Sequence, residues 1–356
     1  MKTIPIIQIG LGGVGRELAR QLIAVRGTVA HHHRVGLSYL ALADSSGVRA
    51  ASSLLSDEAV LAAVATKAAG NPLVPPAGRS PAMRWTSLAM RERAIFVDVT
   101  ASQGHGALLA DRAGSGNRIV LANKIPLSGD LGHFVALTDG GATRYETTVG
   151  AGLPVISTLR GLLDSGDTLI KLEAVMSGTL GFLCSALEDG QPLSVALREA
   201  HALGYTEPDP RDDLSGADVA RKALILARTC GYPWSMADIP AEPWFPPALA
   251  SVSRDEFMAR AEELDAPFAE RVAAAKAAGG ALRYVATVTP EGARVGLQVV
   301  PADHPLASLR GPDNLFSFTT NRYAERPLVI RGPGAGQAVT AAGVLADIIA
   351  TAREMR

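Results

Sequence analysis

Short apolar stretches alternate with helix-like stretches in the first part of the chain. Four of these stretches are apolar enough to predict buried strands: residues 4–9, 35–43, 94–99 and 118–122. After the first of them, Val14, Leu18 and Leu22 recur at the spacing of one helical face, which predicts a helix to about residue 25. Strands that alternate with helices are typical of a doubly wound parallel sheet, so we expect a Rossmann-type α/β fold.

A polar stretch at residues 27–34 separates this helix from the second strand, and we expect it to be a solvated loop. It contains three consecutive histidines, His31, His32 and His33. Consecutive side chains point in different directions, so the three imidazoles are poorly arranged to coordinate one metal ion. The sequence therefore predicts a loop insertion here and no metal site.

The pattern changes after about residue 145, where glycine and proline become frequent and the alternation of strands and helices ends. Further helices are predicted at 192–203, 215–229 and 255–278. Pro267 is expected to kink or break the last of them. Two apolar segments flank a Pro-Glu-Gly sequence at 290–292, which predicts a hairpin. These elements indicate a second domain of the α+β class.

The two patterns predict two domains. Residues 1–149, completed by the segment 331–356, are expected to bind a dinucleotide, because the glycine-rich run at 331–336 is most useful beside a cofactor. Residues 150–330 are expected to bind the substrate. Alternating strands in this second domain, such as 315–319, need a cover on one face, so we expect its sheet to pair two subunits into a homodimer.

Length and composition agree with this interpretation. The chain has 356 residues, more than one hydrophobic core usually holds. With 47% hydrophobic and 19% charged residues it is not a disordered chain. No apolar run approaches the roughly 20 residues of a membrane span, and a net charge of −1 does not suggest a nucleic-acid partner. Residues 1–9 have no signal-peptide pattern and the chain has only two cysteines, so we expect a reduced, cytoplasmic protein without a leader.

A glycine-rich loop follows the first predicted strand directly. Gly10, Gly12 and Gly15 have the spacing G-x-G-x-x-G, with Gly13 and Val14 at the start of the predicted helix. The first glycine permits a tight turn, the second lets a pyrophosphate approach the backbone, and the third packs helix against strand. The helix N-terminus adds free N–H groups for an anion. This loop predicts a dinucleotide cofactor, although a simple tight turn is the alternative.

Asp44, at the end of the second predicted strand, is the candidate partner of the cofactor ribose. It lies 29 residues after Gly15, further than the usual spacing of about 20, and the histidine insertion accounts for the excess. An acidic side chain there favours NAD, because it repels the 2′-phosphate of NADP. Arg49 is close enough in sequence to accept that phosphate, so the sequence does not decide between NAD and NADP. An ordinary turn at Asp44, without a role in cofactor binding, is a further alternative.

A second group of charged residues lies in the middle of the chain. Prolines follow Glu207 and Asp209, which stiffens this acidic loop and suits it to binding an ammonium group. Asp218 and Lys222 come next, four residues apart and hence on one face of the predicted helix. A surface ion pair is the alternative for this spacing. Only six of the 34 basic residues are lysines, which draws attention to Lys222.

Two polar residues close strands of the predicted parallel sheet. Thr100 follows one strand and Lys124 follows the next, with Pro126 suited to the first turn of a helix. Ligands of open α/β sheets bind beyond the carboxyl ends of the strands. Both residues are therefore candidates for contact with the cofactor, and an ordinary strand-closing role is the alternative.

The chain resembles the homoserine dehydrogenase family over nearly its whole length. The motifs that carry the resemblance are the glycine loop and the segments 123–126, 145–154, 177–179, 204–222 and 334–336. The family reduces L-aspartate 4-semialdehyde to L-homoserine with NADH or NADPH, on the route to threonine, methionine and isoleucine. The resemblance implies the same small-molecule substrate for this chain. From this resemblance we expect no appended regulatory domain and no kinase fusion.

The resemblance also implies roles for individual residues. Lys222 would donate the proton, with Asp218 beside it, and Lys124 would lie between cofactor and substrate. The implied substrate-binding residues are Glu207, Asp213, Gly178, Thr179 and Tyr205. The implied neighbours of the nicotinamide are Gly204, Gly334 and Gly336. A monovalent cation, expected to be sodium, would be held by Glu146 and the carbonyls of Val149, Ala151 and Leu153.

Three other functions are consistent with parts of this pattern. One is another amino-acid dehydrogenase of related fold. Aspartate-semialdehyde dehydrogenase would need a cysteine nucleophile, but Cys184 and Cys230 both lie in apolar, helix-like segments. A nucleotide-sensing protein without catalysis is the third, and the presence of Lys124, Asp218 and Lys222 together argues against it.

Overall fold

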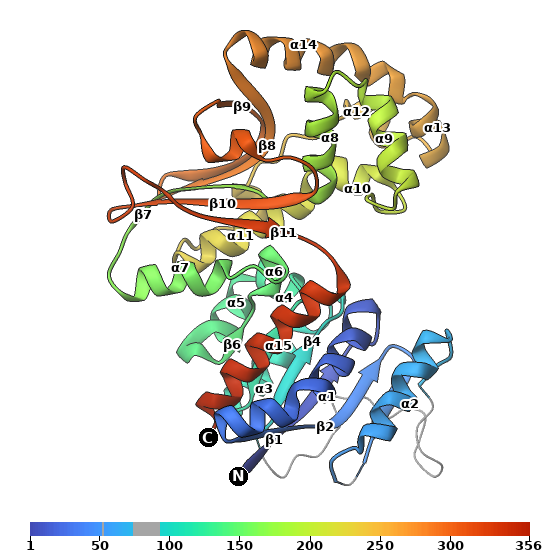
Figure 1. Cartoon of the computed structure of the whole chain (residues 1–356), viewed down its shortest axis with the longest axis vertical. Helices are drawn as coiled ribbons and strands as arrows, with labels where there is room; N and C mark the ends of the chain where they lie inside the picture. The colour runs from blue at the N-terminus through green and yellow to red at the C-terminus, as the bar shows by residue number, and fades with distance from the viewer. Residues whose placement is uncertain (52, 74–92) are drawn as a thin grey trace. The chain divides into compact units, whose positions relative to one another are not determined.

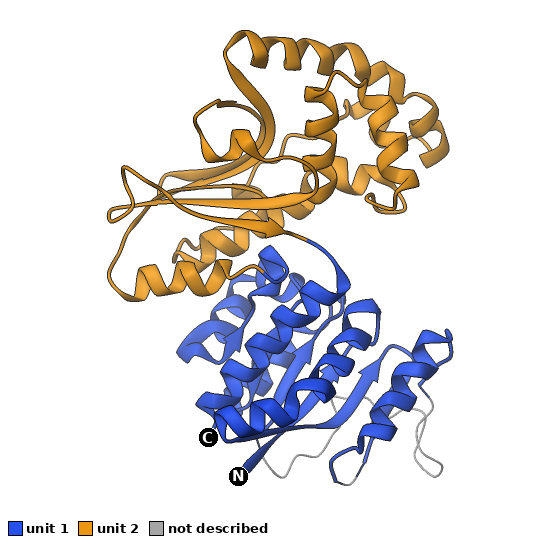
Figure 2. Ribbon diagram, viewed as in Figure 1, with its two compact units in different colours: residues 1–152, 335–356 blue, residues 153–334 orange. Residues whose placement is uncertain are grey.

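The computed structural model of the chain describes residues 1–51, 53–73 and 93–356. These residues form two compact units, coloured separately in Figure 2. Unit 1 contains residues 1–152 and 335–356, and unit 2 contains residues 153–334. The chain therefore passes between the units twice, at 152–153 and at 334–335.

Unit 1 is built on a six-stranded sheet with the order β3-β2-β1-β4-β5-β6. The strands are β1 (Lys2–Ile9), β2 (Val35–Asp44), β3 (Gly47–Ala50), β4 (Ile95–Asp98), β5 (Arg118–Leu121) and β6 (Thr143–Arg144). All neighbours pair in parallel except β3, which pairs antiparallel with β2. The order reverses between β1 and β4, so the predicted doubly wound α/β sheet is confirmed.

Helices cover this sheet. They are α1 (Gly13–His33), α2 (Asp57–Ala68), α3 (Gly106–Gly114), α4 (Ile125–Ser128), α5 (Leu131–Thr138), η2 (Asp139–Gly141), α6 (Thr147–Gly150) and α15 (Gln337–Glu354). The C-terminal helix α15 lies along α1 (Figure 1). It buries Ala341, Val344, Ile348 and Ala352 in the core that β1 and β2 also line, because their spacing of three to four residues puts them on one face.

The histidine insertion is helical, which corrects the loop prediction. Helix α1 continues through Gly27 to His33 and ends at Arg34, whose φ of 58° is left-handed. Val29 is 5% exposed, so the last turns of α1 still pack on the core. The polar residues of 27–34 gave a loop signal, but Val29 keeps the helical spacing, and imidazoles are well placed near a helix C-terminus.

Unit 2 is built on a five-stranded antiparallel sheet with the order β11-β10-β7-β8-β9. The strands are β7 (Leu169–Val175), β8 (Gly280–Thr289), β9 (Gly292–Pro301), β10 (Asp313–Thr320) and β11 (Leu328–Pro333). Residues 331–334, expected in the first domain, belong to unit 2 because β11 extends to Pro333 and pairs with β10. The hairpin predicted around 290–292 is confirmed as β8 and β9.

The helices of unit 2 are α7 (Val155–Asp164), α8 (Gly178–Glu188), α9 (Leu193–Ala202), α10 (Pro210–Leu214), α11 (Ala217–Thr229), η3 (Met236–Asp238), α12 (Pro247–Ala250), α13 (Arg254–Ala259), η4 (Ala261–Leu264), α14 (Asp265–Ala277) and η5 (Pro305–Ser308). The helix predicted at 255–278 is interrupted at residues 260–264 rather than at Pro267. Pro267 is the third residue of α14, where its missing N–H breaks no helical hydrogen bond.

The two faces of the second sheet are covered differently. Helices α8 and α11 pack against the sheet, and Phe316 and Phe318 are fully buried on one face of β10. Leu315 lies on the other face and packs with Leu306 and Leu309 from the short η5 region. Val329 of β11 lies on this second face too, and it is 39% exposed.

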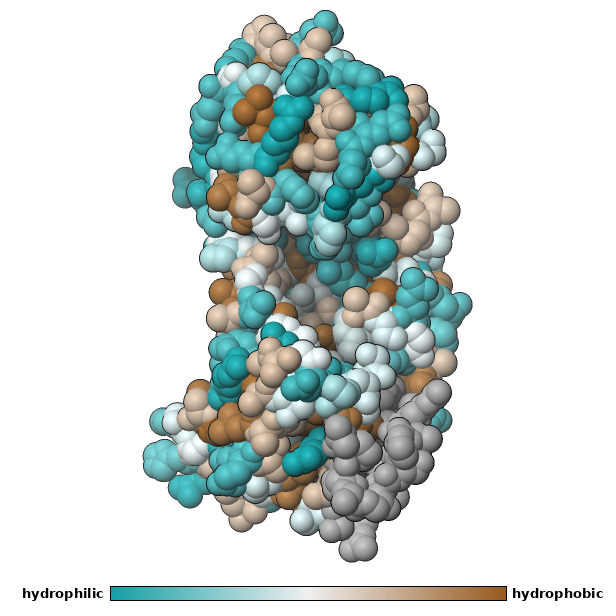
Figure 3. Space-filling model, turned by 90° about the vertical axis from the view of Figure 1, so that its right-hand side faces the viewer, coloured by the Kyte–Doolittle hydropathy of each residue, from teal (hydrophilic) through white to brown (hydrophobic). Residues whose placement is uncertain are grey.

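No helix in the described part of the chain is both long and apolar enough to cross a membrane. On the face that Figure 3 shows, hydrophilic and hydrophobic residues are interspersed. Such mixing is ordinary for a protein surface, because much of it is always apolar.

Candidate functional site

The glycine loop of unit 1 has the geometry that its spacing predicts. Gly10 has a φ of +109°, and a Cβ atom there would lie 2.9 Å from the carbonyl oxygen of Val99. A Cβ at Gly15 would collide with the carbonyl oxygen of Gly10, so both positions exclude any side chain. Gly12, by contrast, faces open space within 4 Å. The first and third glycines are needed for packing, and the second leaves room beside the backbone.

A buried amide holds both ends of this loop, and no sequence pattern indicates it. Gln8 is fully buried, and its Nε2 donates to the carbonyls of Gly10 (2.9 Å) and Gly15 (2.8 Å). Its Oε1 accepts from the hydroxyl of Tyr39 at 2.8 Å. In the sequence, Gln8 is a single polar residue that interrupts an apolar strand pattern. Only the three-dimensional contacts identify it as the support of the loop.

The start of helix α1 suits an anion. Gly12 is its N-cap residue, no side chain caps it, and no acidic residue lies in its first turn. The backbone N–H groups of this turn and the positive end of the helix dipole are therefore available to a phosphate. Together with the space at Gly12, this cradle fits a dinucleotide pyrophosphate.

Asp44 ends β2, the parallel neighbour of β1, and so lies at the same edge of the sheet as the glycine loop. Its Oδ1 accepts from the backbone N (2.8 Å) and the hydroxyl (2.6 Å) of Ser46. Its Oδ2 pairs with the ammonium of Lys67 at 2.8 Å. Partial burial acts to raise the pKa of Asp44, but the hydrogen bonds from Lys67 and Ser46 outweigh it and lower this pKa.

Thr100 and Lys124 also lie at this sheet edge. Thr100 follows β4, and its hydroxyl donates to Asp98 at 2.7 Å. Lys124 follows β5 and is the N-cap residue of α4. Because β4 and β5 are parallel neighbours, unit 1 brings both residues to the edge where Gly10 begins the loop.

The residues expected to hold a cation form a turn after β6. Glu146 is 8% exposed and precedes α6, in which Val149 is buried. Ala151 follows with a φ of 53°, an unusual conformation for a residue other than glycine. Leu153 is the first residue of unit 2, and its carbonyl accepts from Val155 N at 2.9 Å.

The C-terminal glycines are divided between the units. Gly336 has a φ of 118° and precedes α15, whose first residue Gln337 lies against Gly13 of the glycine loop. Gly334 is the last residue of unit 2, and a Cβ atom there would collide with the side chain of Asn314. Gly13, Val14 and Gly336 are thus brought to one region of unit 1, and Gly334 is assigned to unit 2.

A cluster of polar groups forms in unit 2 around Asp213. Its Oδ1 accepts from the hydroxyl of Thr179 (3.0 Å), and its Oδ2 accepts from the backbone N of Glu207 (2.7 Å). The Thr179 hydroxyl also lies 2.6 Å from the carbonyl oxygen of Tyr205. Burial raises the pKa of Asp213, and the carboxylates of Glu207 and Asp218 raise it further. The predicted substrate-binding residues are therefore neighbours.

Two glycines shape the ends of the helices beside this cluster. Gly178 begins α8, where Ser177 caps the helix by accepting from Leu180 N at 3.2 Å. Gly204 follows α9 with a φ of 72°, the left-handed conformation typical of a helix C-terminus. Tyr205, directly after it, is 43% exposed.

Lys222 is the buried cation of this cluster. Its side chain is 11% exposed, and its ammonium pairs with Asp218 Oδ2 at 3.0 Å. It also donates to the carbonyl oxygen of Met176 at 2.7 Å. Met176 follows β7, so the end of a strand fixes the lysine across 46 residues of sequence. The surface-pair alternative does not apply to a lysine with this burial, and sequence alone gives no signal for a backbone acceptor.

Neither cysteine has the properties of a nucleophile. Cys184 is buried and Cys230 is partly buried, and both are free thiols. Burial raises the pKa of each thiol to about 12, so both are protonated at neutral pH. Among the described residues, no group of three or more His, Cys, Asp and Glu side chains is arranged to hold a metal ion.

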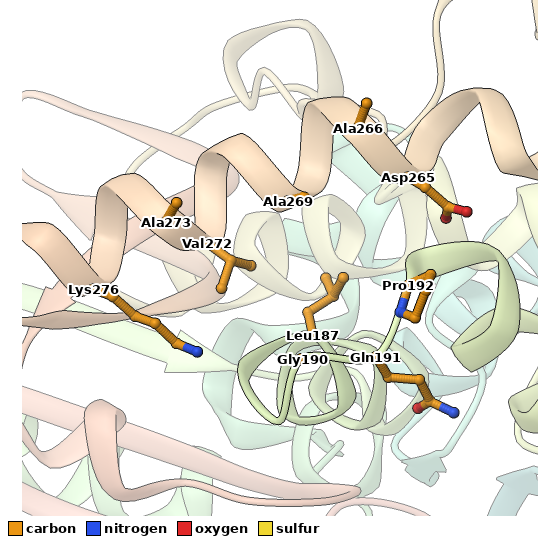
Figure 4. A pocket seen from close by; sticks show the side chains of 10 residues that line it. All are labelled: Leu187, Gly190, Gln191, Pro192, Asp265, Ala266, Ala269, Val272, Ala273 and Lys276. Carbon is orange, nitrogen blue, oxygen red and sulfur yellow. The ribbon is translucent and has the colours of Figure 1, made fainter.

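A pocket elsewhere in unit 2 contains none of the predicted site residues. It has a volume of about 460 Å³ and lies between α14 and the α8–α9 connection (Figure 4). Leu187 and Val272 line it, with Lys276 at one end and Gln191 opposite α14. Its apolar lining and lack of convergent polar groups separate it from the Lys222 cluster.

Comparison with known proteins identifies related chains. The family model for homoserine dehydrogenase matches residues 154–349. A homoserine dehydrogenase of Emericella nidulans is 43% identical over 275 residues, which cover 72% of this chain and 75% of that protein. A bifunctional aspartokinase/homoserine dehydrogenase of Zea mays is 44% identical over 263 residues, which cover 72% of this chain but 29% of that protein.

Solved structures agree on the fold. A hyperthermophilic archaeal homoserine dehydrogenase mutant in complex with NADPH matches with a TM-score of 0.72 at 25% identity, over 98% of this chain and 97% of that chain. The chain spans only 29% to 43% of the length of the bifunctional aspartokinase/homoserine dehydrogenases that it matches.

Proposed function

This chain belongs to the homoserine dehydrogenase family, and on that basis we propose that it interconverts L-aspartate 4-semialdehyde and L-homoserine with a nicotinamide dinucleotide. The observation that carries the proposal is the environment of Lys222. A buried lysine beside an acidic cluster is held by Asp218 and the Met176 carbonyl, which suits proton transfer to a small, positively charged substrate.

The substrate ammonium is bound by the acidic cluster. Glu207, Asp213 and Asp218 lie close enough for their charges to interact, and Lys222 is the cation paired among them. The raised pKa of Asp213 reflects a buried carboxylate without a full counter-charge. An ammonium group of the substrate supplies that charge and forms charge-assisted hydrogen bonds.

Proton transfer falls to Lys222. A nicotinamide held by the glycine loop would supply a hydride to the aldehyde carbon, and negative charge would then develop on the aldehyde oxygen. A lysine ammonium has three N–H donors, and two of them are used on Asp218 and Met176. The third is directed to the substrate oxygen, where it stabilises the developing alkoxide and then donates its proton.

The cofactor is bound by the glycine loop, with its pyrophosphate at the N-terminus of α1. Thr100, Lys124 and Gly336 line the rest of the cofactor site in unit 1. Asp44 binds the adenosine ribose and favours NAD. Lys67 partly neutralises this carboxylate, so the enzyme also accepts NADP.

A monovalent cation, sodium, is held by the turn after β6. Glu146 and Asp347 are both buried there, and Glu146 N donates to Asp347 at 2.9 Å. Two buried acidic side chains favour a cation nearby. The left-handed φ of Ala151 ends the helical pattern of α6, and the carbonyls of Val149, Ala151 and Leu153 on either side of it are the proposed further ligands.

The active form is a homodimer joined through the second sheet. On the sheet face that carries Leu315 and Ser317, the η5 region packs against Leu315. Val329 lies beside Ser317 on the same face. A second copy of this face supplies the missing cover, as expected for an isologous interface.

The reaction is tested by the absorbance at 340 nm when the purified protein is mixed with L-homoserine and either NAD or NADP. Turnover with homoserine supports the proposal. Turnover only with a different hydroxy acid indicates another dehydrogenase of related fold. Cofactor binding without turnover of any such substrate indicates a nucleotide sensor.

A further inference from the structure

A buried carboxylate at the end of β4 collects hydrogen bonds from three segments of unit 1. Asp98 is fully buried. Its Oδ1 accepts from the backbone N (2.9 Å) and hydroxyl (2.7 Å) of Thr100. Its Oδ2 accepts from Asn123 Nδ2 (3.0 Å) and lies 2.9 Å from Nδ1 of His105. The Asp98 side chain therefore makes several hydrogen bonds that do not belong to the pairing of β4 in the sheet.

The second member of this network is Asn123, which is 2% exposed. Besides Asp98, its Nδ2 donates to the carbonyl of Ser102 at 2.8 Å. Its Oδ1 accepts from the backbone N of Ile125 at 3.1 Å. The Asn123 amide therefore ties the loop after β4 to the loop after β5 on both sides of Lys124.

The backbone of Lys124 is fixed as a consequence. Before it, Asn123 is held by Asp98. After it, the Lys124 carbonyl accepts from Leu127 N and from the backbone N and hydroxyl of Ser128, each at 3.0 Å. With both flanks held, the direction in which the Lys124 side chain leaves the sheet edge depends on the Asp98–Asn123 bond.

The same carboxylate supports the glycine loop. Asp98 holds Thr100, and a Cβ atom at Gly10 would lie 3.0 Å from Thr100 Cγ2. The backbone N of Val99 also donates to Ile9 at 2.9 Å, so this segment is tied to β1. One buried group thus sets the relative position of the loop and of Lys124.

We infer that Asp98 and Asn123 are a positioning pair that aims Lys124 for the dehydrogenase reaction. The inference rests on the proposed function, because it takes Lys124 to lie between cofactor and substrate. Removing one partner takes a hydrogen bond from the other buried group, so the geometry around Lys124 relaxes even though Lys124 itself is unchanged. Misplacement by about 1 Å is enough to reduce a rate by on the order of 100-fold.

The test is an exchange of the two side chains. Asp98→Asn directs an amide N–H toward the Asn123 amide, and Asn123→Asp places two carboxylates together. We expect kcat for homoserine oxidation to fall by about tenfold to 100-fold in each single variant. The double variant Asp98→Asn/Asn123→Asp restores a donor opposite an acceptor between the two side chains. Position 123 still loses its donor to the Ser102 carbonyl, so the double variant should recover part of the lost kcat. If it recovers nothing, the pair is not what sets kcat.

A second measurement separates positioning from a general structural role. Asp98→Asn keeps the Oδ1 acceptor of Thr100, and with it the support of the glycine loop, but loses the Oδ2 acceptor of Asn123. In a Lys124→Ala background it should therefore cause little further loss of kcat, because the lost acceptor acts through Lys124. Losses that simply multiply would overturn the inference. Val29→Ala is the matched control, since Val29 is buried near the other end of α1 in the same unit, and kcat should stay within about twofold of wild type. If Asp98→Asn does not fold, Asn123→Ser replaces it in the cycle.

Wild-type turnover of homoserine is measured first, so the two failures can be told apart. An inactive wild-type protein removes the proposed function and this inference with it. An active wild-type protein whose Asp98→Asn and Asn123→Asp variants keep kcat within twofold removes the inference alone.

Discussion

At the scale of single residues, Lys222 differs from an ordinary helix ion pair in its second acceptor. Asp218 lies four residues before it on the same face, which is common on protein surfaces. The Met176 carbonyl is what anchors the lysine inside unit 2. Two fixed acceptors define the direction of the remaining N–H bond, and that direction is what a proton donor requires.

We expect Lys222→Ala to lower kcat by about 10²- to 10⁴-fold, because it removes the proton donor and the partner of the alkoxide. Lys222→Arg should recover little, since a guanidinium stays protonated and has a different reach. Asp218→Asn should show a smaller defect. Steady-state kinetics test this, with Lys276→Ala on the exposed side of α14 as the matched control. A Lys222→Ala enzyme within a few-fold of wild type would mean that the donor lies elsewhere, at Lys124 or in a water.

Asp44 and Lys67 form the residue pair that governs cofactor choice. Asp44→Ala should lower kcat/KM with NAD by about tenfold and leave NADP unaffected or improved, because the repulsion of the 2′-phosphate is lost. Lys67→Ala should do the opposite, lowering kcat/KM with NADP while preserving NAD. The measurement is the ratio of the two kcat/KM values for each variant. Equal losses with both cofactors would assign Asp44 a structural role in the β2–β3 turn.

At the scale of elements, three glycines in helix α1 and at its N-cap lie in different environments. Gly15 cannot accept a side chain, Gly12 faces open space, and Gly27 is exposed in the helix interior with nothing within 4 Å. These differences separate the contributions of packing, ligand binding and helix propensity within one element.

Gly12→Ala should fold with an unchanged melting temperature and bind the dinucleotide much more weakly, because its methyl group occupies the space for the pyrophosphate. Gly27→Ala should keep cofactor binding and gain about 0.5–1 kcal/mol of stability from improved helix propensity. Thermal unfolding and a cofactor titration measure both effects. Normal binding by Gly12→Ala would place the pyrophosphate away from this loop.

The elements also show what a sequence can predict. The apolar runs at 4–9 and 118–122 gave β1 and β5 because burial on both faces leaves a continuous apolar pattern. Residues 27–34 were predicted wrongly because local polarity outweighed one buried residue, Val29. The roles of Gln8, Asp98 and Met176 cannot be predicted from the sequence, since each depends on contacts between distant segments. The ion pair of Lys222 and Asp218 could be predicted because their spacing of four residues is local, while their catalytic role stays a prediction.

At the scale of the whole molecule, the proposed homodimer predicts a mass of twice 37.0 kDa by light scattering at micromolar concentration. Val329→Asp should shift the protein toward the monomer, because it buries a charge in the proposed sheet interface. Val135→Asp on α5 introduces the same charge at a position that is 54% exposed, and should leave the mass unchanged. A wild-type monomer would contradict the dimer.

The C-terminal helix gives unit 1 an unusual order of assembly during synthesis. Residues 337–354 pack along α1, and the ammonium of Lys2 donates to the carbonyl of Met355 at 2.7 Å. The core around β1 therefore stays incomplete until residues 337–354, which follow unit 2 in the sequence, have left the ribosome. Residues 153–334 are continuous in sequence and can fold first. Strand β1 is thus made before unit 2 but reaches its final packing only after residues 337–354 have been made.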